Sequence, residues 1–218
     1  QNQKTDKNDA LAIVQASQLP DIQFINGKSV EQQQLQSMMR LRELAIKQKT
    51  ASSNQIKALL LEFNIRVSPR NGGLKGVMQS TLEDAENGLS VELRQALDAA
   101  WQHYSGLLES IRIYDDCLEL AISEHTDCKR LLKLEGVGTI NAINLYIALA
   151  CAELGAFTKG KDASACIGLT PLQYSSGGKT TLGSIGRYVK NSILRSQLIT
   201  GAMAAVSHAM KRIASDVS

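Results

Sequence analysis

Residues 91–121 read VELRQALDAAWQHYSGLLESIRIYDDCLELA, and this stretch decides the fold class. Its apolar side chains recur at alternating spacings of four and three residues: Leu93, Leu97, Ala100, Tyr104, Leu107, Ile111, Tyr114, Leu118 and Ala121. This is the heptad pattern of a helix that packs along a second helix. A helix over 89–125 would extend ~55 Å at 1.5 Å per residue, which is too long for one compact core.

The stretch before it predicts the partner helix. Ser29 and Gln32 have the spacing of a capping box, and the helix that they start runs to about Ile65, before Pro69. Its apolar residues keep the same register, although Arg42 and other polar side chains interrupt it. We therefore predict a mainly α-helical chain built on a long antiparallel coiled-coil hairpin, which also offers a dimer seam. A plain helical bundle is the alternative.

The composition agrees with a helical protein. Aromatic residues make up 4% of the 218 residues and there are 3 prolines, whereas sandwiches and barrels use many aromatic and β-branched positions with frequent turns. No stretch reaches the ~18 apolar residues of a membrane helix, and we expect no membrane partner. The 4 cysteines lack C-x-x-C spacing, so we expect buried free thiols in a reducing compartment.

Positive charge is concentrated near the carboxyl end. Residues 157–212 contain eight lysines and arginines against one acid, Asp162, although the net charge of the chain is only +3. A basic segment of this kind is typical of a surface that binds a polyanion. A solvated basic surface without a partner is the alternative.

A glycine-containing turn leads into this basic segment. Residues 134–139, LEGVGT, precede an apolar helical run and have the form of a helix-hairpin-helix. Amide groups at the start of the second helix hold phosphate well, which makes Gly136, Gly138 and Thr139 candidate nucleic-acid contacts. An ordinary turn between two helices remains the alternative.

Residues 168–183, GLTPLQYSSGGKTTLG, form the least ordinary stretch. The sequence Gly178-Lys179-Thr180 is reminiscent of a phosphate-binding P-loop, but Gln173 stands where that motif requires its first glycine. The stretch predicts a loop rich in serine, threonine and glycine, and its residues alone favour a flexible surface loop, because no activating base is visible in the sequence beside it. The alternative is a loop whose hydroxyls and amides bind phosphate, or whose serine is a nucleophile.

Two acids lie near the amino end. Asp6 and Asp9 are three residues apart on a predicted helix that runs to Ser17, so both carboxylates face the same side. Paired carboxylates suit Mg²⁺, which prefers oxygen ligands. Taken alone, however, two acids in this position favour surface residues that complement the helix dipole.

Taken in order, these motifs resemble one family. The sequence KTDKNDA at residues 4–10, the long helical middle, GVGT and the 168–183 stretch are similar to the transposases of the insertion-sequence-110 family, especially its 1111 subgroup with the Piv-type DNA invertases. The resemblance implies a RuvC-like α/β domain with four metal-binding acids (Asp, Glu, Asp, Asp), then a coiled coil, then a carboxyl-terminal domain with a catalytic serine.

The resemblance also implies residue roles. By motif position, Asp6 and Asp9 match the last two acids that hold Mg²⁺, and Ser176 matches the nucleophile, with its neighbour Ser175 as the alternative. Family members cut and rejoin DNA through a covalent phosphoserine and are guided by an RNA from their own element. Charge and location add candidate phosphate contacts: Lys179, Arg187, Lys190 and Arg195.

The resemblance divides the chain into three parts. We expect residues 1–27 to be the carboxyl-terminal remnant of the RuvC-like domain, 28–132 the coiled-coil region that makes a homo-oligomer, and 133–218 the serine domain. Compared with the family, the strands that would carry the first Asp and the Glu are missing, and we expect a chain that is truncated at both ends and inactive alone. We expect it to act in the bacterial cytoplasm, at the nucleoid. The alternative is a non-enzymatic nucleic-acid-binding or oligomerisation module.

Overall fold

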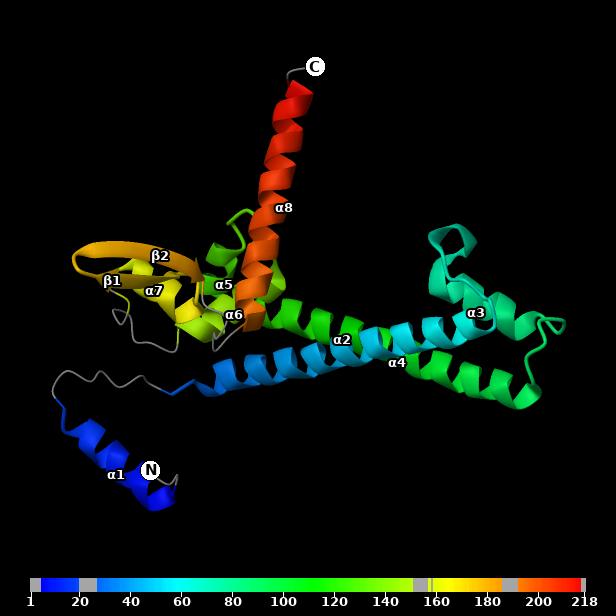
Figure 1. Ribbon diagram of the computed structural model, residues 1–218, viewed down its shortest axis with the longest axis horizontal. Helices are drawn as coiled ribbons and strands as arrows, with labels where there is room; N and C mark the ends of the chain where they lie inside the picture. Colours follow the sequence, from blue (N-terminus) through cyan, green and yellow to red (C-terminus); the bar gives the residue numbers. More distant parts are fainter. Residues whose placement is uncertain (1–4, 20–26, 151–156, 158, 186–191, 217–218) are drawn as a thin grey trace.

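The computed structural model describes residues 5–19, 27–150, 157, 159–185 and 192–216 (Figure 1). Within these ranges the chain is mainly helical, as predicted, with one small sheet. The elements in order are α1 (Asp6–Ser17), α2 (Val30–Glu62), the 3-10 helix η1 (Pro69–Asn71), α3 (Gly73–Glu83), α4 (Val91–Ser123), α5 (Thr126–Leu131), α6 (Thr139–Leu149), α7 (Gly160–Ile167), β1 (Pro171–Ser176), β2 (Lys179–Ile185) and α8 (Ser192–Asp216).

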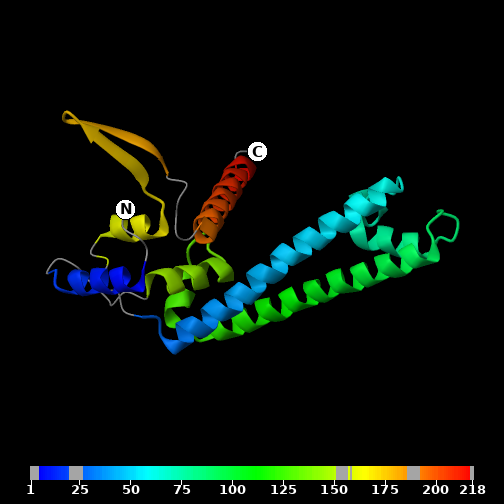
Figure 2. The same cartoon turned by 60° about the horizontal axis from the view of Figure 1, so that its bottom comes forward.

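Helices α2 and α4 form the long axis of the molecule, side by side and antiparallel (Figures 1 and 2). Each has 33 residues and therefore extends ~50 Å. The predicted capping box starts α2: Ser29 Oγ accepts from the Gln32 amide at 3.2 Å, and Gln32 Oε1 accepts from the Ser29 amide at 3.0 Å. Ser90 caps α4 through a single hydrogen bond, in which its Oγ accepts from the Leu93 amide at 3.2 Å. Local sequence therefore fixes where both helices begin.

The predicted heptad positions of α4 turn towards α2. The first eight are buried or half-buried, while Ala121 is exposed and Ile122 is buried in its place. The interruption at Arg42 on α2 is explained by a partner, because its guanidinium Nε donates to Asp115 on α4. The helical hairpin is present, and its supercoiling as a coiled coil stays a prediction.

A hydrophobic cluster lies at each end of the hairpin. At the far end, α3 folds back onto α2 and α4, with Ile56, Leu60, Val77, Met78, Leu89 and Leu97 buried together. At the near end, α5 and α6 complete a second cluster of Leu35, Met39, Leu118, Ile122, Cys128, Ile143 and Ile147. The sequence did not predict α3, because a helix of 11 residues shows its apolar pattern over only three turns.

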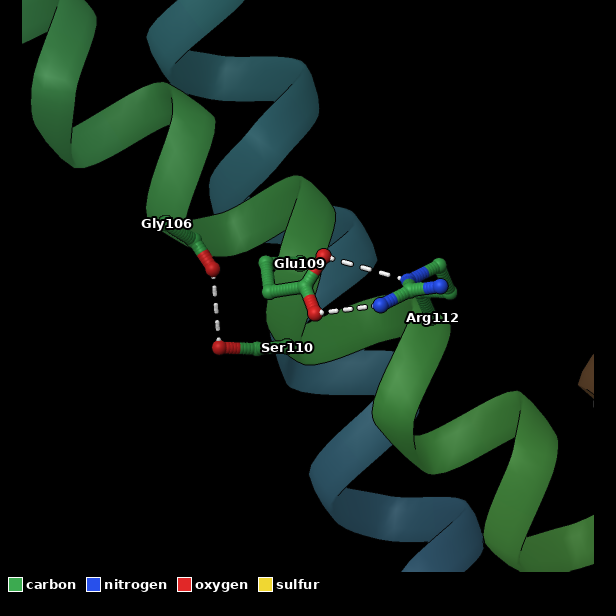
Figure 3. A network of polar contacts seen from close by, with 4 residues as sticks. All are labelled: Gly106, Glu109, Ser110 and Arg112. Atoms are coloured by element: carbon green, nitrogen blue, oxygen red, sulfur yellow. Dashed lines mark hydrogen bonds and ion pairs between the residues drawn. The ribbon is translucent and has the colours of Figure 1, made fainter.

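The outer face of α4 carries a polar network (Figure 3). Arg112 donates from Nε and Nη2 to the Glu109 carboxylate at 3.1 and 2.8 Å, and Ser110 Oγ donates to the Gly106 carbonyl at 2.9 Å. The Arg112 hydrogen bonds lower the pKa of Glu109. Exposed ion pairs of this kind contribute little to stability. The Arg42–Asp115 pair in the seam is better shielded, since only 17% of the Arg42 side chain is exposed.

The stretch expected to be a loop is instead a β-hairpin. Strands β1 and β2 pair antiparallel across the two-residue turn Gly177-Gly178, whose φ angles are +58° and +80°. Two consecutive positive φ angles are what a tight hairpin of this length requires, and glycine supplies them without steric cost. The flanking Tyr174, Thr180 and Thr181 favour strands. The loop prediction is therefore wrong, and the physical reason is the Gly-Gly turn.

Helix α8 contributes to a hydrophobic cluster through its first turns only. Leu194 is fully buried with Leu145 and Ile167, and the carboxyl-terminal half of α8 extends away from the hydrophobic clusters (Figures 1 and 2). From its second turn onwards, α8 exposes apolar side chains at spacings of four and three: Ile199, Met203, Val206, Met210 and Ile213. Across the part of the chain that is described, no helix is long and apolar enough to cross a membrane.

Candidate functional site

Ser176 lies at the tip of the β-hairpin. It is the last residue of β1, it is exposed, and it stands directly opposite Lys179, the first residue of β2. Side chains alternate between the faces of a strand, so Ser176 shares its face with Tyr174 and with their partners Lys179 and Thr181. We call these four residues the serine face.

The register separates the two candidate serines. Ser175 pairs with Thr180 and points to the opposite face of the hairpin from Ser176. Directly opposed side chains on one face have their Cβ atoms ~5 Å apart, so a lysine side chain lies opposite Ser176 and a threonine side chain lies opposite Ser175. Ser176 is therefore the serine that has a lysine opposite it.

The turn between α5 and α6 is shaped by glycine. Gly136 has φ +82° and is half-buried, and a Cβ atom there would overlap the carbonyl oxygen of Gly201 on α8. Gly138 is exposed at the start of α6, where no side-chain cap is present, and Thr139 follows it half-buried. Gly136 thus lets α8 approach closely, while Gly138 and Thr139 offer first-turn amides to an anion.

Polar contacts fasten α8 across this turn. Asn144 Nδ2 donates to Gln197 Oε1 at 2.8 Å, and Asn141 Nδ2 donates to the Gln197 carbonyl at 3.3 Å. Arg212 Nη2 lies 3.1 Å from Glu135 Oε1. The sequence reading missed these residues, because their pairing joins segments more than fifty residues apart and no local pattern marks it.

The predicted basic contacts lie on different elements. Lys179 is exposed on the serine face. Arg195 is half-buried in the first turn of α8 and lines a hollow of about 400 Å³ together with the hydroxyl-bearing Ser192, Ser196 and Thr200. Arg187 and Lys190 lie outside the described residues.

Asp6 and Asp9 occupy the first turn of α1, which Thr5 caps by accepting from the Asn8 amide at 3.4 Å. Both carboxylates are exposed on the same side of the helix. They supply two oxygen ligands of the kind that Mg²⁺ accepts alongside a substrate phosphate. Over the described ranges, no group of three or more His, Cys, Asp or Glu side chains is placed to hold a metal ion.

The cysteines differ from the expectation of buried thiols. Cys128 is fully buried, and burial, followed by the charges of Asp127 and Glu31, raises its pKa to about 11. Cys117 and Cys166 are exposed, so the expectation is wrong for these two, and Cys151 lies outside the described residues. The three described cysteines are free thiols.

Comparison with known proteins finds a family match in the carboxyl-terminal part of the chain. Residues 128–217 match the family described as Transposase IS116/IS110/IS902 family. The predicted resemblance to this family is confirmed. No solved structure matches the chain.

Curated relatives extend the similarity over most of the chain. It is 31% identical over 205 residues to the transposase for insertion sequence element IS1111A of Coxiella burnetii, covering 94% of this chain and 56% of the relative. It is 32% identical over 184 residues to the transposase for insertion sequence element IS1328 of Yersinia enterocolitica, covering 84% and 54%. It is 31% identical over 207 residues to a probable family 20 transposase of Pseudomonas aeruginosa, covering 93% and 60%. The chain therefore spans about half the length of these relatives.

Proposed function

We propose that this chain is part of a DNA transposase that cuts and rejoins DNA through a phosphoserine formed at Ser176. The observation that carries the proposal is the register of the hairpin, in which the exposed Ser176 is paired with the exposed Lys179 on one face. The family relationship supports DNA as the substrate.

The proposed step is a displacement at phosphorus. Ser176 Oγ forms a bond to the scissile phosphorus while the bond from phosphorus to a deoxyribose oxygen breaks, and the hydroxyl proton passes to solvent or a nearby base as the leaving oxygen takes one up. Lys179 sits where its charge neutralises a non-bridging phosphate oxygen, and such stabilisation of developing charge is a large term in phosphoryl transfer. Rejoining reverses the step with another DNA hydroxyl.

Asp6 and Asp9 are the residues that would hold Mg²⁺. Their two carboxylates fit the donor chemistry of that ion, and the remaining ligands would come from substrate phosphate, water and other acids. The chemistry that the ion supplies when bound is stabilisation of an alkoxide and neutralisation of phosphate charge.

The remaining predicted residues serve to hold the nucleic acid. The start of α6 at Gly138 and Thr139 would bind one backbone phosphate through its amides, and Arg195 with its neighbouring hydroxyls would bind another. Motif position and charge add Gly136, Arg187 and Lys190 to this surface. The proposal also includes a guide RNA, which would select the DNA by base pairing. It further includes a homo-oligomer formed along α2 and α4.

The test uses a chimaera in which this chain replaces the matched residues of the IS1111A transposase, supplied with its element's DNA, RNA and Mg²⁺. We expect a protein–DNA adduct that survives denaturing electrophoresis, is lost in Ser176→Ala and persists in Ser175→Ala. An adduct that persists in Ser176→Ala overturns the proposal. Salt-sensitive DNA binding with no adduct in any variant would favour a non-enzymatic nucleic-acid-binding module instead.

A further inference from the structure

Tyr174 stands out on the serine face because a large aromatic ring is left in solvent. Every residue of β1 is exposed, and Tyr174 itself is 61% exposed. A hairpin of two strands has little core of its own. An aromatic side chain on such a hairpin can bury its ring against the hairpin backbone or against a bound partner.

One edge of the ring lies against the hairpin itself. A Cβ atom built on Gly183 would lie 3.1 Å from Tyr174 Cε2 and 3.3 Å from the Leu172 carbonyl oxygen. The missing side chain at 183 therefore makes room for the ring against the neighbouring strand. One edge of the ring therefore lies over the Gly183 position, and the remainder of the ring is open to a partner.

The neighbours of the ring are those that a nucleotide needs. Tyr174 and Ser176 are two residues apart on one strand, so their side chains stand ~6.6 Å apart on the same face. Lys179 adds a positive charge opposite Ser176. A cation for the phosphate and an open aromatic ring for the base are the two elements by which proteins bind single-stranded nucleic acid.

We propose that Tyr174 is a stacking platform for an unpaired nucleobase of the nucleotide next to the phosphate attacked at Ser176. The inference rests on the proposed function and adds to it a positioning residue and a requirement that this base leave the duplex. A base stacks on a side chain only when its own face is uncovered, which favours an opened strand over intact duplex. Tyr174 then orients the backbone so that the scissile phosphorus meets the serine hydroxyl.

The hairpin offers its own control. Leu182 is exposed to a similar extent, at 67%, but it pairs with Gln173 and therefore points to the opposite face from Tyr174. Leu182→Ala removes an equally exposed apolar side chain without touching the serine face. Tyr174→Phe keeps the ring and removes only the phenol hydroxyl.

The test measures binding, not chemistry, in the 218-residue chain carrying Ser176→Ala. The probe is a single-stranded DNA oligonucleotide with 2-aminopurine placed at each position in turn, whose fluorescence is quenched by stacking. We expect Tyr174→Ala to raise Kd about fivefold to tenfold and to abolish quenching at one position, while Tyr174→Phe and Leu182→Ala bind like the parent. Gly183→Ala, which displaces the ring, should weaken the quenching.

Two outcomes overturn the inference. Unchanged affinity and quenching in Tyr174→Ala would show that the ring does not stack on a base, and an equal loss in Leu182→Ala would show that the effect is not specific to the serine face. Circular dichroism of each variant checks that the fold is retained. Because the serine is already replaced, either failure leaves the proposed nucleophile standing, which the adduct experiment tests separately.

Discussion

Single glycines decide how closely the helices of this molecule approach. Gly136 and Gly201 face one another across the docking of α8, and a Cβ atom on either would overlap the carbonyl oxygen of the other. Gly106, in contrast, lies on the outer side of α4 with nothing within 4 Å of its Cβ position. Both Gly106 and Gly201 lie within helices. Comparing them therefore separates the backbone entropy that glycine costs in a helix from the close approach that glycine allows where α8 crosses the α5–α6 turn.

We predict opposite effects of alanine at these two glycines. Gly106→Ala should raise the free energy of unfolding by roughly 0.5–1 kcal/mol, because alanine loses less backbone entropy in a helix. Gly201→Ala should lower it by about 1–3 kcal/mol, because the methyl group forces the helices apart. Urea denaturation followed by circular dichroism measures both, and destabilisation by Gly106→Ala or tolerance of Gly201→Ala would contradict the packing described here.

The thiols should differ in reactivity. At pH 8 we expect a disulfide reagent to label Cys117 and Cys166 rapidly and to spare Cys128 until the protein unfolds, because Cys128 is buried and its pKa is raised to about 11. Since the thiol has a higher pKa in the fold than its ordinary 9.0, its contribution to stability is present below pH 9 and is lost as the pH rises towards 11. Mass mapping of the labelled peptides checks this; Cys128 labelling at the rate of Cys166 would refute it.

At the scale of elements, the sequence predicts features that depend on neighbouring residues, and it misses the pairing of strands. Ser29 is predicted to cap α2 from the residues next to it, and the structure shows this cap. The heptad spacing within α4 predicts its buried side, and most of these positions are buried or half-buried. The β-hairpin was missed because its serines, threonines and glycines lack the apolar alternation that marks a strand. The motif indicates Ser176 as the candidate serine, but the position of Lys179 opposite Ser176 follows only from the strand register.

The pair Arg42–Asp115 tests the seam between α2 and α4. We predict that Asp115→Ala lowers the free energy of unfolding by roughly 1–2 kcal/mol, because it leaves the half-buried Arg42 guanidinium without its acceptor. Glu109→Ala serves as the control, since its partner Arg112 is well exposed and should be left hydrated by water. Equal effects of the two substitutions in thermal or urea unfolding would contradict the shielding of the seam.

At the scale of the whole molecule, packing is concentrated at the two ends of the helical hairpin and leaves other elements open. The hydrophobic clusters join α3 to the far end and α5 and α6 to the near end, while α1 has no buried residue and the serine face is open to solvent. The residues with proposed chemistry are thus those with the least support from the core, as expected of groups whose partner is another molecule.

Hydrogen exchange should follow this division. We predict that the amides of α1 exchange fast, because a helix of 12 residues without buried side chains is only marginally stable in water, whereas those around Leu60 and Leu118 are protected by the two clusters. Strong protection of residues 9–17 in the isolated chain would contradict the exposed placement of α1.

The most direct measurement locates the nucleotide on the protein. Trypsin cleaves after Lys161 and Lys179 and so releases residues 162–179 as one peptide that holds both Ser175 and Ser176. Tandem mass spectrometry of the adduct formed by the chimaera, after nuclease digestion, should place the phosphonucleotide on Ser176. A nucleotide on Ser175, or on any residue outside this peptide, would contradict the assignment of the serine face as the reacting surface.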